Sequence, residues 1–282
     1  MKSLFMRYPG GKSKAVTFSY DDGVEQDKRL SDIFTKYGMK GTFNLCQPKF
    51  TKEEAEQYFF SRGHEIATHG ALHRASGNVR AIDGIRDVLD CRLALEEGYD
   101  RIIRGMAYPD TGITIMGNFV GYERIKSYLT DLDIAYARTL GGDNDSFALP
   151  EDFHAWLPTA HHKNPDLPGY IDKFLALDLS TNLYHARRQS RLLYIWGHSY
   201  EFDRDGNWDL IETICRRLSG NDEIWYATNM EICEYVEAYK RLVYSADGTK
   251  VYNPTLITVW VDFGGDVYSI APGETVRIDI KK

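Results

Sequence analysis

Short apolar runs alternate with longer amphipathic segments along most of the chain. The runs at 15–20 (AVTFSY) and 191–197 (RLLYIWG) have the length and the β-branched and aromatic content of buried strands. The segment at 24–38 has apolar residues at helical spacing and ends at Gly38, a common helix terminator. Strands that alternate with helices predict parallel strands joined by helical crossovers.

The same pattern predicts further strands and helices up to residue 243. The predicted strands are 15–20, 40–46, 64–69, 102–108, 134–139, 191–197 and 223–227, and the predicted helices are 24–38, 51–63, 79–98, 120–133, 207–220 and 230–242. With about seven parallel strands, we expect a closed or nearly closed α/β barrel over residues 1–243 rather than an open sheet.

After residue 243 the pattern changes to apolar and polar positions that alternate strictly. Residues 257–263 place their apolar side chains on one face of a strand, and so do residues 275–282. Asp247-Gly248 and Gly264-Gly265 are typical of hairpin turns. Residues 244–282 are therefore predicted to form a small antiparallel β appendage.

Composition narrows the class of protein. The 282 residues are 43% hydrophobic with a net charge of −7, so one large core is expected, and nucleic acid or an anionic membrane surface is a poor match as partner. No apolar run approaches the roughly 20 residues that span a bilayer. Residues 1–14 hold too short an apolar stretch for a signal peptide, so we expect a cytoplasmic location unless an export signal has been trimmed away. The four cysteines form no CxxC pair, which indicates reduced thiols.

Two adjacent carboxylates, Asp21 and Asp22, end the first predicted strand in the sequence FSYDDG. Asp-Asp-Gly is good turn chemistry, and a turn is the simplest interpretation of this motif alone. Like charges side by side are unfavourable, however, unless a cation lies between them or they share a task. Whether this motif is a simple turn or part of a functional site depends on which residues follow the other predicted strands.

Polar clusters come after three further predicted strands. THGALH places His69 and His73 four residues apart, a spacing that can bring two imidazoles to one metal ion. His198 comes after the strand at 191–197, and a turn rich in Pro and Gly lies at 105–112. In α/β barrels the chemistry lies at the carboxyl ends of the strands, so these clusters are expected to converge on one mouth. This convergence favours a site over a simple turn.

The motifs FSYDDG, HGALH, YPDTG and IWGHS, in this order, resemble those of the polysaccharide deacetylase family, carbohydrate esterase family 4. The resemblance covers roughly residues 14–242, the NodB homology domain of that family. It implies a distorted (β/α) barrel of the NodB type for the domain with about seven predicted strands, and the small antiparallel β appendage predicted from the alternating pattern follows that domain. It also implies a site for a divalent metal, with zinc as the first expectation.

The resemblance also implies roles for individual residues. Asp22, His69 and His73 would bind the metal, Asp21 would be the general base, and His198 the general acid. The backbone N–H of Asp110, after Pro109, would help to form the oxyanion hole. Hydrolysis of an amide or ester requires these parts on chemical grounds: an activated water, a base, donors for the oxyanion and an acid for the leaving group.

The chain departs from the family pattern at two positions. Ala107 stands where the family's third motif usually carries an arginine that holds the base and pairs with an aspartate of the fourth motif. The nearest match to that fourth motif is DFHAW, which has Ala155 before Trp156. Losing both partners of a buried ion pair costs far less than losing one, so a divergent branch is expected. What orients Asp21 is left open by the sequence.

Four further residues are candidate substrate contacts: Tyr108, Trp156, His161 and Trp196. Aromatic residues near a barrel mouth serve as sugar platforms or, more often, as packing. The expected activity is removal of N- or O-linked acetyl groups from a carbohydrate. Two alternatives stay open: a small-molecule amidohydrolase, and a carbohydrate-binding protein with a degraded site. The sequence does not determine the sugar, the metal or the oligomeric state.

Overall fold

The structure is a computed structural model, and it describes residues 4–110, 112–113, 121–140, 143–179 and 189–278. The strands of the main sheet are β2 (Lys14–Asp22), β3 (Gly41–Leu45), β4 (Glu65–Thr68), β5 (Gly105–Ala107), β6 (Tyr136–Arg138), β7 (Ala160–His161), β8 (Arg191–Gly197) and β9 (Ile224–Tyr226). The helices are α1 (Gln26–Lys36), α2 (Lys52–Tyr58), α3 (Ala81–Tyr99), α4 (Tyr122–Asp131), α5 (Leu167–Leu175), α6 (Tyr200–Arg204), α7 (Trp208–Leu218) and α8 (Asn229–Lys240). Short 3₁₀ segments are η1 (Pro9–Gly11), η2 (Phe60–Arg62), η3 (Ser76–Asn78) and η4 (Phe153–Ala155).

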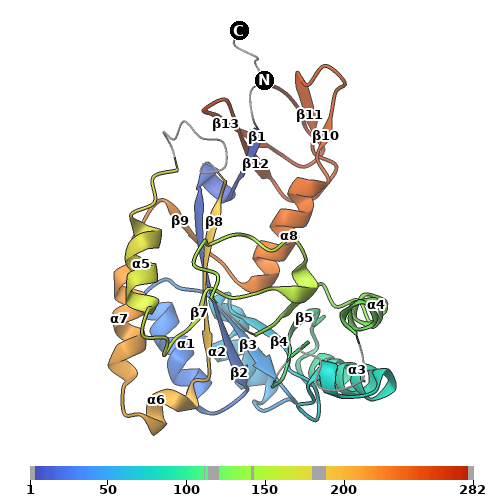
Figure 1. Cartoon of the computed structure of the whole chain (residues 1–282), viewed down its shortest axis with the longest axis vertical. Helices are drawn as coiled ribbons and strands as arrows, with labels where there is room; N and C mark the ends of the chain where they lie inside the picture. The colour runs from blue at the N-terminus through green and yellow to red at the C-terminus, as the bar shows by residue number, and fades with distance from the viewer. Residues whose placement is uncertain (1–3, 111, 114–120, 141–142, 180–188, 279–282) are drawn as a thin grey trace.

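The main sheet is parallel and curled, with strand order β6-β5-β4-β3-β2-β8-β7 and β9 paired with β2. Figure 1 shows α1, α5, α6 and α7 on one side of it and α3 and α4 on the other. All seven predicted strands are present, and β7, α5 and α6 are additional elements. The predicted distorted barrel with a C-terminal antiparallel appendage is confirmed.

One segment reaches across the open side of the curled sheet. Trp156 forms a single parallel bridge with Arg138 on the edge strand β6. Four residues later, Ala160 pairs with Ile195 of β8. The segment 156–161 therefore contacts both β6 and β8, and it brings the two ends of the sheet together into a nearly closed barrel.

The central strand β2 shows how the sequence pattern builds this barrel. Val16, Phe18 and Tyr20 belong to the apolar core shared with the helices. The residues between them are small or polar, and Thr17 Oγ1 lies 2.9 Å from Asn229 Oδ1 on the barrel side. Because side chains alternate across a strand, the even-numbered residues pack outward and the odd-numbered ones line the interior.

The appendage includes a strand from the start of the chain. Its two three-stranded antiparallel sheets are β1-β12-β13 and β10-β11-β14, with bounds β1 (Leu4–Arg7), β10 (Val243–Tyr244), β11 (Lys250–Tyr252), β12 (Val259–Phe263), β13 (Asp266–Ile270) and β14 (Thr275–Arg277). The sequence boundary at 243/244 placed β1 with the barrel, whereas the structure pairs it with β12. Residues 279–282 of the predicted appendage lie outside the described ranges.

The appendage lies at the end of the sheet where the strands begin (Figure 1). The nine residues of β2 run from that end to Asp22. At about 3.3 Å per residue, roughly 30 Å separate the appendage end from the carboxyl end of β2.

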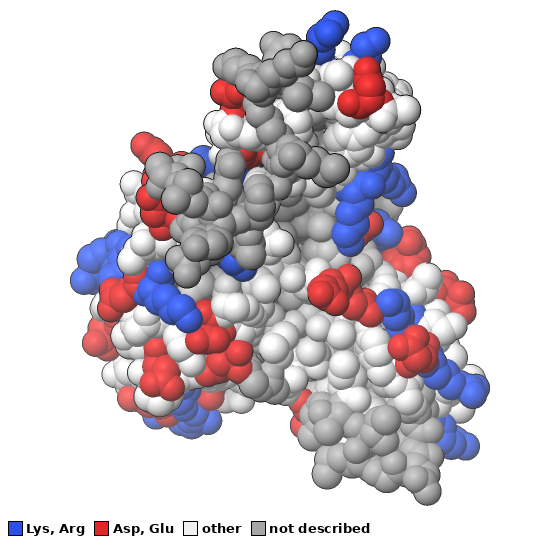
Figure 2. Space-filling view, turned by 45° about the horizontal axis from the view of Figure 1, so that its top comes forward, with Lys and Arg blue, Asp and Glu red and all other residues white. Residues whose placement is uncertain are grey.

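Charges of both signs are interspersed on the face shown in Figure 2, and no single-sign area dominates that view. Within the described ranges, no helix combines the length and apolar character that crossing a membrane requires. The four cysteines are free thiols, as expected.

Candidate active site

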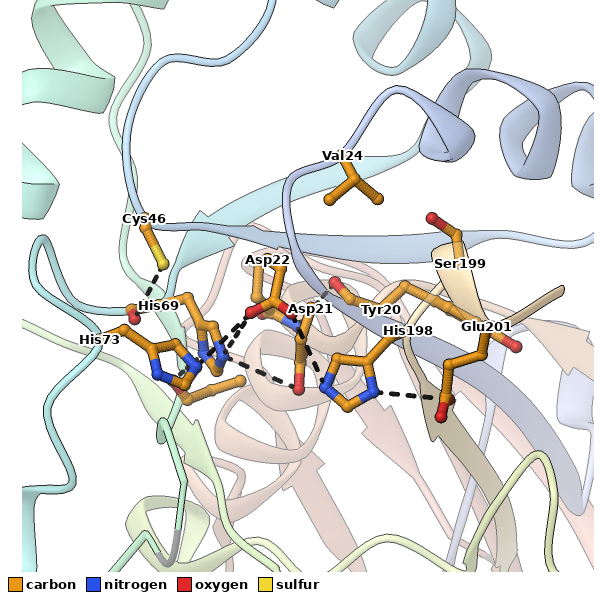
Figure 3. Close-up of polar contacts among 12 residues, drawn as sticks. Tyr20, Asp21, Asp22, Val24, Cys46, His69, His73, His198, Ser199 and Glu201 are labelled. Atoms are coloured by element: carbon orange, nitrogen blue, oxygen red, sulfur yellow. Dashed lines mark hydrogen bonds and ion pairs between the residues drawn. The ribbon is translucent and has the colours of Figure 1, made fainter. Parts of the chain in front are cut away.

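The carboxyl ends of the parallel strands lie in one layer. The pairing register places side by side Asp22 of β2, Leu45 of β3, Thr68 of β4 and Met106 of β5. On the other side of β2, Tyr20 pairs with Gly197 of β8. His69 and His198 each come directly after one of these strands, so both reach the same edge of the sheet as the two aspartates (Figure 3).

The two adjacent aspartates lie in different environments. Asp21 is 2% exposed and points into the barrel interior, in line with the odd-numbered residues of β2. Asp22 has a φ of 80° and is followed by Gly23 with a φ of 63°, so the chain turns sharply at the mouth. The pleat of the strand and this turn separate the two carboxylates and give each its own partners.

Asp22, His69 and His73 form a group that could hold a metal ion, with ligand atoms within 4.8 Å of one another. Asp22 Oδ1 lies 3.6 Å from His69 Nε2 and 3.5 Å from His73 Nε2 (Figure 3). Tetrahedral zinc with bonds of about 2.0 Å separates its ligand atoms by roughly 3.3 Å, which matches this spacing. His69 Nδ1–H donates to Ala107 O at 2.9 Å, which leaves the lone pair of Nε2 free for the ion. The donor set therefore fits a divalent metal.

Arg138, at the end of β6, is the ion-pair partner of Asp21. Its Nη2 donates to Asp21 Oδ2, and the two side chains are 0% and 3% exposed. The guanidinium carbon lies 4.5 Å from the ring centroid of Trp196, within the range of cation–π attraction. Asn44 Nδ2 donates to the other carboxylate oxygen at 2.8 Å. Arg138 is thus the residue that orients Asp21, which the sequence left open.

These contacts keep Asp21 ionised inside the barrel. Burial alone would raise the pKa of Asp21, but the positive charge of Arg138, followed by His69 and His198, outweighs it, and the pKa falls below its usual value. A carboxylate held in its charged form beside a candidate metal site is suited to accept a proton.

The ion pair between Arg138 and Asp21 depends on the curl of the sheet. Their strands, β6 and β2, are separated by β5, β4 and β3 in the pairing order. In a flat sheet four steps of about 4.8 Å would place them roughly 19 Å apart. The barrel instead brings the two side chains into direct contact across its interior.

His198 faces the metal group from the opposite side. Its Nε2 lies 3.9 Å from Asp22 Oδ2, and its side chain is 23% exposed (Figure 3). The next residue, Ser199, donates from Oγ to Asp27 Oδ1 at 2.6 Å, and Val24 N–H donates to Asp27 Oδ2 at 2.9 Å. The buried Asp27 therefore ties the loop after β2 to the loop after β8 and sets the position of His198 relative to Asp22.

Behind His198, one carboxylate oxygen of Glu201 lies close to three imidazole rings. This atom, Oε2, lies 3.1 Å from His161 Nε2, 3.4 Å from His162 Nε2 and 3.5 Å from His198 Nδ1. His161, His162 and Glu201 also meet the spacing of a metal group. Lys163 N–H, however, donates to His161 Nδ1 at 3.1 Å, so the ring proton of neutral His161 lies on Nε2 and faces the carboxylate. We therefore interpret this group as an ionic cluster that supports His198 and assign no metal to it.

Asp110 lies in the turn after β5, at a left-handed φ of 48°. The turn is closed by Gly112 N–H, which donates to Pro109 O at 2.9 Å. A Cβ added to Gly70 would lie 3.4 Å from Pro109 Cγ, so this turn lies against the loop that carries the two histidines. Its role in binding an oxyanion stays a prediction.

The four candidate substrate contacts divide into two pairs. Tyr108 and Trp156 are each 1% exposed, and Tyr108 Oη donates to His154 O at 2.8 Å, so neither presents a surface to a substrate. Trp156 packs among aromatic side chains and Tyr108 in a mainly aliphatic cluster, so we keep neither as a contact. Trp196 and His161 lie together near the mouth, with ring centroids 4.6 Å apart, and both are partly exposed.

Four residues of the site were not singled out from the sequence: Asn44, Asp27, Arg138 and Glu201. Arg138 was findable in principle, because it is a charged residue near the end of an apolar predicted strand, as Asp21 is. Asp27 and Glu201 lie on helices α1 and α6 among many other acidic residues, so nothing local distinguishes them.

Comparison with known proteins supports the family resemblance. The family described as polysaccharide deacetylase matches residues 8–114. No curated protein matches the chain. The predicted resemblance is confirmed for the residues that carry the Asp pair, the two histidines and the turn after β5.

Solved structures support the fold. A structure from Mycobacterium smegmatis, provisionally described as a polysaccharide deacetylase, is 19% identical over 85% of this chain and 96% of its own, with a TM-score of 0.55. A structure from Pseudomonas aeruginosa PAO1 with a similar provisional description is 12% identical over 80% and 92%, also with a TM-score of 0.55. At these identities the likeness shows the fold alone, which is that of the polysaccharide deacetylases.

Proposed function

We propose that this chain, which carries the polysaccharide deacetylase signature over residues 8–114 on that family's fold, is a divalent-metal-dependent hydrolase that removes acetyl groups from a carbohydrate. One observation carries the proposal. Asp22, His69 and His73 converge at the barrel mouth with the ionised Asp21 on one side and His198 on the other. The cluster holds a metal-binding group, a base and an acid within a few ångströms.

Asp21 acts as the general base in this proposal. Its Oδ2 lies 4.0 Å from His69 Nε2, so it borders the space that the three ligand atoms enclose. Arg138 and Asn44 fix the orientation of the carboxylate and leave it charged. A divalent metal bound by the three ligands would lower the pKa of a water molecule toward about 7 and polarise the acetyl carbonyl. Asp21 then takes the proton of the attacking water.

His198 acts as the general acid. Its Nε2 faces the mouth near Asp22, while Nδ1 faces Glu201 Oε2 at 3.5 Å. The carboxylate behind the imidazole orients the ring so that Nε2 can deliver a proton to the leaving amine or alcohol. The backbone N–H of Asp110 would stabilise the developing oxyanion, and Trp196 and His161 would contact the sugar.

The experiment is acetate release by the zinc-loaded protein across a substrate panel: chitin oligomers, acetylated xylan, peptidoglycan fragments and acetylated monosaccharides. Activity on chitin or peptidoglycan would identify N-deacetylation, and activity on xylan would identify O-deacetylation. Activity confined to small non-sugar amides would favour the amidohydrolase alternative. Bound zinc with no hydrolysis of any compound would favour a degraded, carbohydrate-binding site.

Metal dependence is tested with a matched pair of histidine variants. His69→Ala should lose bound zinc, measured by elemental analysis, together with acetate release. His154→Gln is the control, because its imidazole donates to Ile134 O at 2.7 Å outside the metal group. Equal zinc content in the two variants would contradict the proposed site.

A further inference from the structure

The loop after β4 carries the candidate metal ligands His69 and His73. Three of its backbone N–H groups donate hydrogen bonds to one buried residue, Asp87 of α3. Leu72 N–H donates to Asp87 Oδ1 at 2.6 Å, and Arg74 N–H donates to Oδ2 at 3.2 Å. Ala71 N–H donates to the backbone carbonyl of Asp87 at 2.9 Å. These donors flank His73 on both sides, although Asp87 is remote from it in sequence.

Only glycine can occupy position 70 without a clash, because the loop backbone passes very close to the Asp87 carboxylate. Gly70 has a φ of 70°, and a Cβ added to it would lie 2.3 Å from Asp87 Oδ2 and 3.2 Å from Asp87 Cγ. The close approach allows the loop to wrap around the carboxylate. His73 itself has a φ of 51°, which is unfavourable for a side chain larger than glycine and must be offset by surrounding contacts.

The histidines differ in how they are supported. His69 follows β4 directly, its N–H donates to Leu45 O at 2.9 Å, and its Nδ1 is held by Ala107 O. His73 lies in the loop, its side chain is 40% exposed, and its N–H donates only weakly, to Gly70 O at 3.3 Å. The position of His73 relative to Asp22 therefore depends on the loop more than that of His69 does.

Helix α3 presents a second group to the same region. Cys91 lies four residues after Asp87, on the same face of the helix, and its Sγ donates to Leu45 O at 3.1 Å. Leu45 O also accepts the N–H of His69. One face of α3 thus contacts both the loop after β4 and the end of β3, which makes the helix a rigid support for the ligand loop.

We infer that Asp87, together with Gly70, is a positioning residue that holds the His69–His73 loop in the conformation that brings His73 to the metal. The inference rests on the proposed metal site and adds the residue that presets it. A carboxylate that accepts one N–H at each oxygen fixes the backbone on both sides of His73 and orders the loop before any ion binds. Loss of such supporting bonds typically lowers metal affinity by about 10–100-fold.

The experiment compares Asp87→Asn with Val88→Ala, both tested as full-length protein. The first substitution is isosteric but replaces one acceptor oxygen by a donor NH₂, which opposes one of the two loop N–H groups. Val88 is the matched control, because it is 1% exposed on the same helix and packs in a separate apolar cluster. Zinc affinity is measured by chelator competition at a temperature where all variants are folded. We expect a Kd about 10–100-fold higher for Asp87→Asn and an unchanged Kd for Val88→Ala.

A second readout needs no metal. In the metal-free protein, hydrogen exchange of the amides of Leu72 and Arg74 should be faster in Asp87→Asn and unchanged in Val88→Ala. If wild-type protein binds no zinc while exchange responds as expected, the proposed function fails and the loop support stands. If wild-type protein binds zinc and Asp87→Asn changes neither Kd nor exchange, the inference is overturned.

Gly70→Ala provides an independent check, because its effect on the zinc Kd should depend on whether the Asp87 carboxylate is present. Alone, it should weaken zinc binding, because the added methyl group meets the Asp87 carboxylate and the residue must keep a positive φ. In an Asp87→Ala background the carboxylate is gone, so adding Gly70→Ala should raise Kd by a smaller factor. Equal factors in both backgrounds would show that the two residues act separately and would overturn the assignment to Gly70.

Discussion

Two carboxylates at opposite ends of the parallel sheet, the buried Asp21 and the partly buried Glu65, are stabilised in different ways. At the carboxyl end, Asp21 is paired with the full charge of Arg138, and its pKa is held below its usual value. At the amino end, Glu65 accepts bonds from Tyr136 Oη at 2.6 Å, Thr42 Oγ1 at 2.8 Å and the N–H of Met230 at 2.9 Å. These are neutral donors, and burial raises the pKa of Glu65 to about 7.

The difference separates a reactive carboxylate from a structural one. Glu65 bonds β3, β6 and the start of α8 to one another at the end of the sheet away from the candidate site. Asp21 must stay charged in the interior to act as a base, so it requires a cationic partner there. The same side-chain chemistry therefore serves the site at one end and the closure of the barrel at the other.

The largest expected effect separates the two adjacent aspartates. Asp22→Asn should lose zinc, with activity partly restored by excess zinc, because Asp22 is the one carboxylate in its metal group. Asp21→Asn should keep zinc near the wild-type level and lose turnover by about 10²–10⁴-fold, the range for loss of a general base. Measuring zinc content and kcat for both variants shows which aspartate binds the metal and which acts as the base. Zinc loss in Asp21→Asn alone would mean that the two roles are exchanged.

Arg138→Met tests whether the cation at the carboxyl end is required. Leaving Asp21 buried without its partner should lower the free energy of unfolding by about 3–5 kcal/mol, measured by urea denaturation. Since Arg138 lowers the pKa of Asp21, its loss should raise that pKa and shift the acidic limb of the kcat–pH profile to higher pH. The double variant Arg138→Met/Asp21→Asn should recover part of the lost stability. An unchanged pH profile in Arg138→Met would contradict the role assigned to the ion pair.

Glu65→Gln tests the amino end through pH. A carboxylic acid whose pKa is about 7 in the folded state and near 4.5 when unfolded binds its proton more tightly in the native protein between those values. Wild-type stability contributed by Glu65 is therefore fully present below about pH 4.5 and is lost as the pH rises through about 7. The stability of wild type relative to Glu65→Gln should fall by about 1–3 kcal/mol between pH 5 and pH 7.5, measured by urea denaturation. A difference that does not vary with pH would show that Glu65 is ionised throughout.

Val261→Ala in the appendage should give the smallest effect. Val261 is fully buried on β12 and pairs with Met6 of β1, about 30 Å from the site by the length of β2. Removing two methyl groups should cost about 1–2.5 kcal/mol of stability, and kcat measured well below Tm should not change. A lower kcat in this variant would connect the appendage to substrate binding or to the geometry of the barrel.

The fold was predictable because its elements are local and strongly patterned. The run at 15–20 and the alternation in 257–263 became β2 and β12, at bounds shifted by a few residues. What the sequence pattern missed was pairing over distance: residues 4–7 belong with β12 near the other end of the chain. The sequence of a short strand does not identify the strand that it pairs with, because backbone hydrogen bonds are the same for any sequence.

The candidate site was predictable in part for a chemical reason. Asp21, Asp22, His69 and His198 each lie at the carboxyl end of a predicted parallel strand, and such ends share one edge of a sheet. Substrate contacts were less predictable. Tyr108 and Trp156 have the residue type of a sugar platform but lie in the core, and residue type does not distinguish burial from exposure at a barrel mouth.

The sequence by itself determined which residues end the strands, which faces of those strands are apolar, and which side chains could bind a metal ion. The resemblance of its motifs to those of the deacetylase family already gave Asp21 and Asp22 separate roles. Only the tertiary structure decided that Arg138 pairs with Asp21, that Asp87 supports the ligand loop, and that β1 joins the appendage. Those three contacts depend on the curl of the sheet and on how helices and strands pack across it, and no local pattern encodes the distance between residues that are far apart in the chain.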